Sequence, residues 1–363
     1  MSTASSQQRQ FPCRNCGANL VFAPGQVALV CPYCRTENIV EALGEAVEEL
    51  DFQVTLATAA QGEETVEALT VHCEACGAEQ TLAANVTADR CAFCGAAIVT
   101  GPETHASLKP RSLLPFHVPA AQAMELFLDW VASRWFAPND LKRHAEAGGL
   151  KGVYIPYWTY DCATRTKYTG ERGEDYWTTE TYTAHENGRA VTKTRQVRKT
   201  RWYPASGMVS NTFDDVLVLA SHSLPRKYTE SLEPWDLGNL VPYREEYLAG
   251  FVAERYQMGL EEGFEDAKGK MEEPIRQSIR RDIGGDHQRI HSMNTRYEQI
   301  TFKHLLLPLW ISAYRYRDKV FRFLVNARTG EVCGERPYSM WKIAVLTLFC
   351  AIVFAVILFF ANQ

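Results

Sequence analysis

Hydrophobic and polar positions divide the chain into a helical region followed by a strand-rich region. Residues 120–136 have the spacing of an amphipathic helix. Its predicted apolar face consists of Met124, Phe127, Leu128, Val131 and Trp135. Pro138 is expected to end this helix, and a second helix is expected to begin at position 139 or 140. The apolar face is interpreted as core packing.

From residue 151 onward, the pattern changes to runs of aromatic and β-branched residues, which predict β-strands. The Asn-Gly dipeptide at 187–188 lies between two such runs and predicts a two-residue hairpin turn. Further antiparallel strands are expected over 305–332, with turns at 318–319 and 329–330.

Two short motifs in this region share one pattern, YIPYW at 154–158 and LLPLW at 306–310. They indicate two related halves of a sheet, each with a strand that opens on a proline. The stretch between the halves, 244–285, has a mostly helical pattern that Pro274 is expected to divide. Together these elements predict an α+β fold with an antiparallel sheet over 151–337.

The hydrophobic pattern closes with an uninterrupted apolar run, residues 343–361, which contains no charged side chain. As a helix this run would be about 29 Å long, close to the ~30 Å hydrocarbon core of a bilayer. Tyr338, Trp341 and Lys342 precede it, as aromatic and positively charged residues do at a membrane interface. A transmembrane helix over 341–361 is predicted, and its place at the end of the chain predicts tail-anchored insertion.

Eight of the eleven cysteines form an internal repeat of Cys-x-x-Cys pairs. A glycine follows the second cysteine of three pairs and eases a tight turn, whereas Arg35 stands at the fourth place. Short β-prone segments between the pairs would bring the two turns of each set together. The first set is Cys13, Cys16, Cys31 and Cys34, and the second set follows 60 residues later as Cys73, Cys76, Cys91 and Cys94.

Each set suits a structural zinc ion. Four thiolates about 2.3 Å from the ion complete a tetrahedral site and leave no open position for water or substrate. The first residues contain no apolar signal segment, so persistent disulfides are not favoured. A redox pair and an iron site are less favoured alternatives. Two zinc ribbons, at 1–40 and 71–100, are therefore predicted, with two zinc ions as cofactors.

Charge argues against a polyanionic partner for these ribbons. The net charge of the chain is −5, and residues 1–100 contain four Arg, no Lys and twelve Asp or Glu. Because nucleic-acid affinity rests on Lys and Arg that neutralise phosphates, the ribbons are interpreted as protein-facing or purely structural. The segment 41–70, with eight acids and no base, is expected to be a solvated acidic linker.

One segment is strongly basic, residues 189–203, with six Lys or Arg and no acid. On a strand, alternate positions place Arg189, Lys193, Arg195, Lys199 and Arg201 on one face. This face is either a charged edge strand protected from aggregation or a contact for anionic lipid headgroups. The candidate residues for an anionic surface are Lys193, Arg195, Lys199 and Arg201.

Two motifs suggest enzymes but lack essential residues. His287 and His291 have the spacing of a metalloprotease motif, but Gln288 stands where the glutamate base belongs, so solvated or core histidines are expected. Residues 263–271 are similar to a phosphate-binding loop, but the spacing is one residue too long and Met271 replaces the magnesium-binding Ser or Thr. No catalytic set is evident, and the chain is predicted not to be an enzyme.

Several stretches resemble a bacterial family of zinc-ribbon membrane proteins. They are SRWFAPNDL, LKGVYIPYWTYD, TRWYPASG, FDDVLV, LEPWDL, RRDIGGDHQRIHS and TFKHLLLPLW. With the ribbons and the apolar run, the resemblance extends over nearly the whole chain. Family members are called TFIIB-type zinc-ribbon proteins or primosomal protein N-prime (replication factor Y) superfamily II helicases. The resemblance implies a bacterial origin, and only the ribbon cysteines carry over as functional positions.

The predicted function is a single-pass inner-membrane protein with a cytoplasmic N-terminal head that acts as an adaptor for an unidentified protein partner. Lipid contact is expected through the C-terminal helix. One alternative is a nucleic-acid-binding replication or primosome accessory without its own ATPase, although nucleic acid is not the favoured partner. The other is an enzyme with a site in the α+β domain. The predicted segments are zinc ribbon 1 (1–40), acidic linker (41–70), zinc ribbon 2 (71–100), linker and helices (101–150), α+β domain (151–337) and transmembrane helix (341–361).

Overall fold

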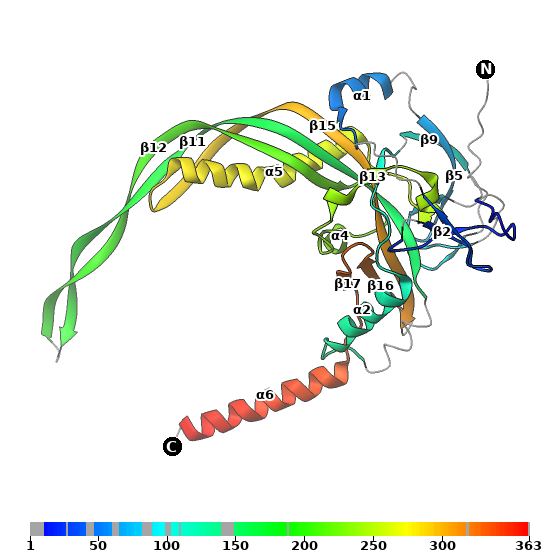
Figure 1. Cartoon of the computed structure of the whole chain (residues 1–363). Coiled ribbons are helices and arrows are strands. Elements are labelled where there is room, and N and C mark those ends of the chain that lie inside the picture. Colours follow the sequence, from blue (N-terminus) through cyan, green and yellow to red (C-terminus); the bar gives the residue numbers. More distant parts are fainter. Residues whose placement is uncertain are drawn as a thin grey trace.

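The structure, a computed structural model, describes residues 11–26, 28–40, 47–59, 65–81, 89–98, 103–108, 110–138, 149–186, 189–316 and 319–361. Antiparallel strands dominate the fold, helices cover parts of them, and one apolar helix lies near the C-terminal end (Figure 1). The predicted α+β fold with two four-cysteine clusters is confirmed.

Three long strands form the centre of a nine-stranded sheet: β11 (Lys151–Glu186), β12 (Arg189–Leu219) and β15 (His287–Tyr316). β11 lies in the middle and pairs antiparallel with both of the others. Its aromatic and β-branched residues alternate between the two faces of the sheet, as strand geometry requires. The smaller strands of this sheet are β4 (Leu50–Asp51), β10 (Ser112–Leu113), β13 (Val241–Pro242), β14 (Val252–Ala253), β16 (Lys319–Asn326) and β17 (Val332–Gly334).

The outer parts of β11 and β12 leave the body of the protein as a long curved ribbon (Figure 1). We call residues 162–213 the arm. Its register shows no shift from the pair Cys162–Phe213 outward, and β15 accompanies it only as far as Gly173. The outermost part is therefore two-stranded. The strands on either side of the predicted hairpin turn are paired, while 187–188 lie outside the described residues.

α5 (Leu260–Ile283) lies along one face of the arm and the sheet (Figure 1). Pro274 lies inside this continuous helix on its exposed side, so the prediction that it divides the region is wrong. The packed apolar face outweighs the ~3 kcal/mol that an internal proline costs a helix. This face packs on aromatic residues of the sheet and consists of Phe264, Ala267, Met271, Ile275, Ile279 and Ile283.

The two proline motifs also differ from the expectation that each opens a strand. Pro156 and Pro308 lie inside β11 and β15, and the two motifs are neighbours, with Tyr154 opposite Pro308. Each proline lacks an N–H but keeps its carbonyl. Those carbonyls accept hydrogen bonds from the N–H groups of Ala220 (3.0 Å) and Ala327 (3.1 Å). The sheet therefore accommodates both prolines in its interior.

The segment predicted to be a solvated acidic linker is folded in its described part. β4 pairs with β15, and α1 (Phe52–Ala59) follows directly. Phe52 is buried and its ring packs against those of Tyr160 and Phe264. The expectation of a spacer does not hold for residues 47–59, because one aromatic ring within the acidic stretch reaches the core.

A buried lysine joins this segment to the root of the arm. The Lys303 ammonium lies 2.8 Å from a carboxylate oxygen of Asp215, 3.0 Å from Glu49 and 3.3 Å from Asp161. Burial raises the pKa of Asp161, whereas the hydrogen bond from Lys303 lowers the pKa of Glu49. The carboxylates of Asp161, Asp214 and Asp215 are close enough to hold a cation, and Lys303 supplies that positive charge.

α2 (Ala120–Ala132) is shorter than predicted. Phe127 and Val131 are buried as expected, but Trp135 lies beyond the end of the helix and is exposed. Ser133 caps the helix and donates its hydroxyl to the carbonyl of Trp130 at 2.7 Å. Trp135 is therefore not part of the apolar face. The second helix predicted after Pro138 falls outside the described residues.

The remaining elements form small sheets and short connections, apart from the long helix α6 (Met340–Ala361). β1, β2 and β3 form one sheet, β5 (Thr65–His72) lies between β6 and β9 in another, and β7 pairs with β8. The bounds are β1 (Val21–Phe22), β2 (Ala28–Val30), β3 (Glu37–Ile39), β6 (Glu79–Thr81), β7 (Asp89–Arg90), β8 (Ala97–Ile98), β9 (Glu103–Leu108), α4 (Arg226–Glu230), η1 (Leu237–Asn239) and η2 (Glu245–Leu248).

We expect two glycines of α5 to respond oppositely to alanine. At Gly263 an added Cβ would lie 2.4 Å from the Tyr160 hydroxyl oxygen and 2.8 Å from Trp158, whereas at Gly269 it would meet open space. Gly269→Ala should stabilise the fold by ~1 kcal/mol through helix propensity. Gly263→Ala should destabilise it by roughly 1–3 kcal/mol through overpacking. Urea unfolding followed by tryptophan fluorescence measures both, and shifts in the same direction would contradict the packing.

Candidate metal centres and membrane helix

Each Cys-x-x-Cys pair forms the same tight turn. The residue after the second cysteine donates its N–H to the carbonyl of the first, as Gly17 does to Cys13 at 2.9 Å. That residue has a positive φ in all four turns: 75° at Gly17, 77° at Gly77, 72° at Gly95 and 58° at Arg35. Arg35 thus adopts the left-handed conformation that glycine takes at the other three places.

The turns bring the four sulfur atoms of each set within 4.8 Å of one another. Sulfurs of facing pairs lie 3.4 Å apart in the first set and 3.6 Å apart in the second. Sulfurs bound about 2.3 Å from one tetrahedral ion would be ~3.8 Å apart, so each set could close around a metal ion with a small expansion. The sets are those predicted: Cys13, Cys16, Cys31 and Cys34, and Cys73, Cys76, Cys91 and Cys94.

Hydrogen-bond donors near these sulfur atoms favour the charged thiolate form, whereas burial disfavours it. The N–H of Asn15 lies 3.4 Å from Cys13 Sγ, and the hydroxyl of Thr36, 3.1 Å from Cys34 Sγ, lowers the pKa of Cys34 to about 5. Burial raises the pKa of Cys94 to about 11. A bound cation is what allows four adjacent thiols to be thiolates together at neutral pH, and the geometry is consistent with zinc.

Ribbon 1, described over residues 11–26 and 28–40, packs against the body of the protein. Phe22 is buried, and its ring lies 5.2 Å from that of Tyr247. Its N–H donates to the carbonyl of Ala249 at 2.9 Å. Two of the ribbon's cysteines belong to the same hydrophobic cluster as Leu113 on the central sheet. Metal binding in this ribbon is therefore coupled to the packing of the body.

Ribbon 2 is held to the body by polar contacts that sequence reasoning missed. Gln80 is buried and forms a β-bridge with Glu254, and the side-chain amide of Gln257 donates to the carbonyl of Gly77 at 2.8 Å. The Glu254 carboxyl accepts a hydrogen bond from the Ser221 hydroxyl at 2.8 Å, and burial raises its pKa to about 8. No local pattern marks these residues, since their partners are far away in the sequence.

The predicted basic residues of β12 lie on one face of the arm, because the register has no shift there. α5 covers this face nearer the body, and beyond the end of α5 the face is largely open. Glu180 forms ion pairs with Lys199 at 2.8 Å and Arg195 at 3.5 Å, and Arg201 lies over the ring of Tyr176. Exposed pairs of this kind contribute little to stability. A contact with an anionic surface stays a prediction.

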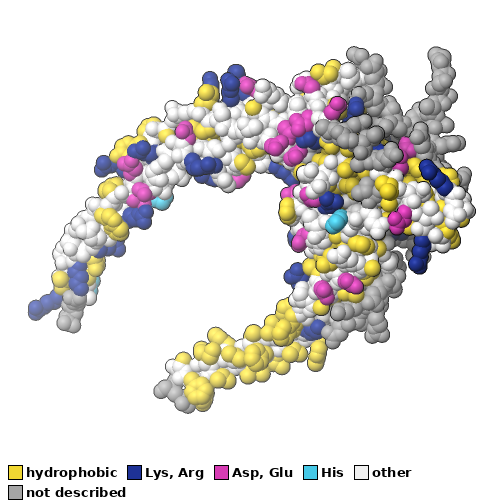
Figure 2. Space-filling view, viewed as in Figure 1, with side chains coloured by type: hydrophobic (Ala, Val, Ile, Leu, Met, Phe, Trp, Pro, Cys, Tyr) yellow, Lys and Arg dark blue, Asp and Glu magenta, His cyan; other side chains and the backbone are white. Residues whose placement is uncertain are grey.

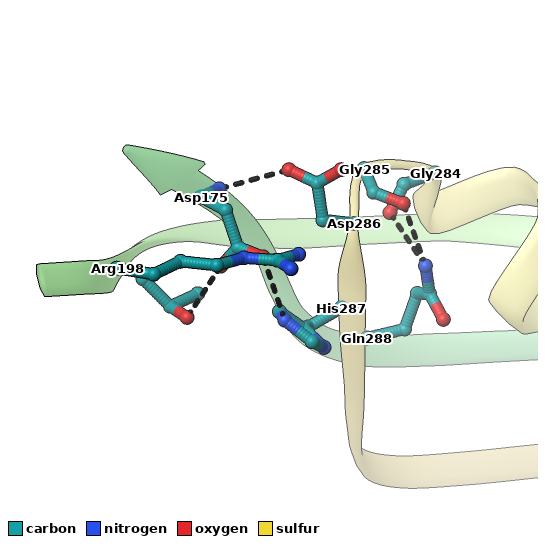
Figure 3. Close-up of polar contacts among 8 residues, drawn as sticks. Asp175, Arg198, Gly284, Gly285, Asp286, His287 and Gln288 are labelled. Carbon is teal, nitrogen blue, oxygen red and sulfur yellow. Dashed lines mark hydrogen bonds and ion pairs between the residues drawn. The ribbon is translucent and has the colours of Figure 1, made fainter. Parts of the chain in front are cut away.

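The two histidines lie at the start of β15 and not on a helix. Figure 3 shows the two-glycine corner between α5 and β15, where the Asp286 carboxylate accepts the N–H of Asp175 at 2.8 Å. His287 Nε2 lies 3.1 Å from the Asp175 carboxylate, which also binds Arg198. His291 is exposed, as expected. This corner fixes β15 to the arm, and each of the two histidines lies near a carboxylate of the arm.

Residues 263–271, compared above with a phosphate loop, lie inside α5. A phosphate loop presents free N–H groups at the N-terminal end of a helix, which the middle of a helix cannot do. The Lys270 ammonium donates to the carbonyl of Leu217 at 2.7 Å. The geometry therefore agrees with the rejection of this motif, while the absence of enzymatic activity stays a prediction.

Within the described residues, α6 is the helix that is long and apolar enough to cross a membrane. It has 22 residues, and the mean hydropathy of its most apolar window is 3.1. No residue of that window is buried against the rest of the protein (Figure 2). At 1.5 Å per residue it is about 33 Å long. By length and composition, α6 can span a bilayer, and its bounds agree with the predicted span at 341–361 to within one residue.

No protein-family model matches the chain, and no solved structure matches it. A curated relative, the uncharacterized protein YdjG of Bacillus subtilis (strain 168), is 26% identical over 242 residues. The match covers 65% of this chain and 66% of the relative, just under two thirds of its length. At this identity the chain is similar to YdjG, whose own function is uncharacterized.

We expect the purified full-length protein to contain about two equivalents of metal ion per chain. Replacing Cys13 and Cys16 by serine should remove about one equivalent, because the second set stays complete. Cys350→Ser, a change in α6 outside both sets, is the control and should leave two. Elemental analysis measures the stoichiometry. Protein with intact reduced thiols but almost no metal would show that the clusters are not metal sites.

Proposed function

We propose that this protein is a zinc-binding, membrane-anchored adaptor whose head binds another protein in the cytoplasm. The observation that carries the proposal is the presence of two closed four-cysteine sites and one apolar helix in a single chain. A closed site has no position for a substrate, which favours a structural role for its ion. The resemblance to bacterial TFIIB-type zinc-ribbon membrane proteins supports the same function.

Zinc is the proposed ion at both sites. Four thiolates in tetrahedral arrangement are a ligand set for zinc, and iron–sulfur clusters are the main alternative for such donors. The two sites repeat one local turn geometry, and the turns lie in small sheets of two or three strands, with the second site joining two of them. Ion binding then contributes directly to the folding of each ribbon.

The proposed topology places the head in the cytoplasm and α6 across the inner membrane as a tail anchor. Arg336 and Lys342 lie on the head side of the apolar run, and positively charged residues favour the cytoplasmic side. A reducing compartment also suits eight metal-binding thiols better than an oxidising one.

Ribbon 1 is the proposed surface for the protein partner. Tyr33 lies inside the second Cys-x-x-Cys turn and Ile39 on β3, and both side chains are 81% exposed. Aromatic residues such as tyrosine are enriched at protein–protein interfaces relative to the rest of the surface. The lack of lysine in residues 1–100 disfavours nucleic acid as the partner.

The basic face of the arm is proposed as a weaker, accessory contact for an anionic surface. Residues 174–201 contain six bases and four acids. Each Lys or Arg near an anionic membrane contributes about 1 kcal/mol, so the net excess favours only a salt-sensitive contact. The residues proposed for it are Lys193, Arg195, Lys199 and Arg201.

A photo-crosslinking amino acid tests the adaptor role in the full-length, membrane-embedded protein. Placed at Tyr33 or Ile39, it should give a discrete adduct with another protein. The same group at Thr181, an exposed position on the arm, is the control and should give none. The adduct should also disappear when Cys13 and Cys16 are serine. No adduct at either ribbon position, in protein that carries its metal, would rule out ribbon 1 as the partner surface.

Removal of residues 341–363 tests the anchor. The shortened protein should leave the membrane fraction and keep its metal, because α6 is exposed and the clusters lie elsewhere. In spheroplasts of cells with the full-length protein, external protease should leave the ribbons intact. Digestion of the ribbons while the membrane remains sealed would show that the proposed topology is wrong.

A further inference from the structure

The turn that follows α2 lies beside the first turn of α6 (Figure 1). Ser339 donates its N–H to the carbonyl of Phe136 at 2.8 Å, and the Lys342 ammonium donates to the carbonyl of Ala137 at 2.8 Å. The second pair is separated by 205 positions in the sequence. The base of the apolar helix is therefore built from two distant parts of the chain.

Large exposed aromatic residues are the sequence neighbours of the residues that form this junction. Trp135, Tyr338 and Trp341 are 76%, 58% and 78% exposed. Single exposed apolar residues are ordinary, but three large exposed aromatic residues next to one junction indicate a contact. Three cations accompany them. We call this set the collar, and it consists of Arg134, Trp135, Arg336, Tyr338, Trp341 and Lys342.

We propose that the collar is a contact with the lipid interface, in which Trp135 from the α2 turn lies at headgroup level beside Trp341. Tryptophan and tyrosine favour this zone because one part of each ring is apolar and another part forms hydrogen bonds. The neighbouring Arg and Lys side chains can pair with lipid phosphates. The proposal rests on the membrane anchor proposed above and adds a contact that lies outside the membrane helix.

Continuity with α6 is the reason to assign lipid to this surface and not a protein partner. Trp341 is followed by Lys342 and then by the uncharged run 343–361, so a bilayer that accommodates this run has its interface at Trp341. The two hydrogen bonds hold the Trp135 turn at the same level. A partner protein would have to displace headgroups to reach it.

The contact would also set how close the head lies to the bilayer. α2 is fixed to the central sheet, since its Phe127 ring stacks on Phe323 of β16 with ring centres 3.4 Å apart. Trp135 lies three residues beyond the end of α2, so the depth of Trp135 in the interface would fix the distance between the sheet and the bilayer. A membrane helix alone would fix only the point where the chain enters the bilayer.

Tryptophan fluorescence in brominated vesicles tests the collar. The full-length protein is reconstituted into phosphatidylcholine and phosphatidylglycerol vesicles whose acyl chains carry bromine close to the headgroups. Subtracting the signal of Trp135→Phe from that of the wild type isolates Trp135 among the eight tryptophans. We expect bromine to quench this signal about twofold, as for an interfacial residue. The phenylalanine keeps an aromatic ring, and circular dichroism together with metal content confirms that the variant is folded.

Two further variants separate the outcomes. Trp177→Phe changes an exposed tryptophan on the arm, on the face opposite Lys199, and its signal should not be quenched. Trp341→Phe reports on the anchor itself. A quenched Trp341 with an unquenched Trp135 would overturn the collar and leave the anchor in place. If neither is quenched, the membrane proposal fails as well. Equal quenching of Trp135 and Trp177 would also overturn the collar, because the effect would not be specific to this junction.

Discussion

The pairing of β11 with β12 on one side and with β15 on the other is the interaction on which the rest of the structure depends. Alternation along β11 sends Tyr154 into the hydrophobic cluster that holds ribbon 1 and Ile155 into the cluster that holds ribbon 2. The ribbons are thus attached to opposite faces of one strand. Further along, Trp158 lies in the cluster beneath α5. A slip of one residue in this register would exchange the faces and remove the support of both metal sites at once.

The local features of the protein could be predicted from sequence, and the long-range ones could not. The cysteine turns depend on a four-residue geometry and a ligand chemistry that spacing reveals, and the turn at Arg35 adopts that geometry although it lacks the glycine. The apolar helix is evident from composition alone. Pro274 misled the prediction because tertiary packing overrides local propensity. Lys303 and Glu254 were missed, since each is an ordinary charged residue whose partners come from distant segments.

The two ribbons are parts of the domain core and not appended modules. Each contributes cysteines to a hydrophobic cluster shared with the central sheet. Ribbon 2 is also fastened through Glu254, whose burial is offset by hydrogen bonds from Ser221 and Ser223. The free energy of metal binding therefore stabilises the central sheet as well as the two ribbons. Loss of metal or binding of a partner at a ribbon would alter the packing of the sheet, and through α2 the packing at the base of the apolar helix.

The unshifted register of the arm has a consequence for how its length can vary. Odd and even positions of β12 lie on opposite faces of the arm. Inserting a single residue into β12 would therefore move Lys199 and Arg201 from the face that α5 covers nearer the body to the opposite, threonine-rich face. Adding one residue to each strand at the tip, in contrast, would lengthen the hairpin and leave every existing pair intact. Variants of this protein can therefore differ in reach by matched additions at the turn, while the chemistry of each face stays the same.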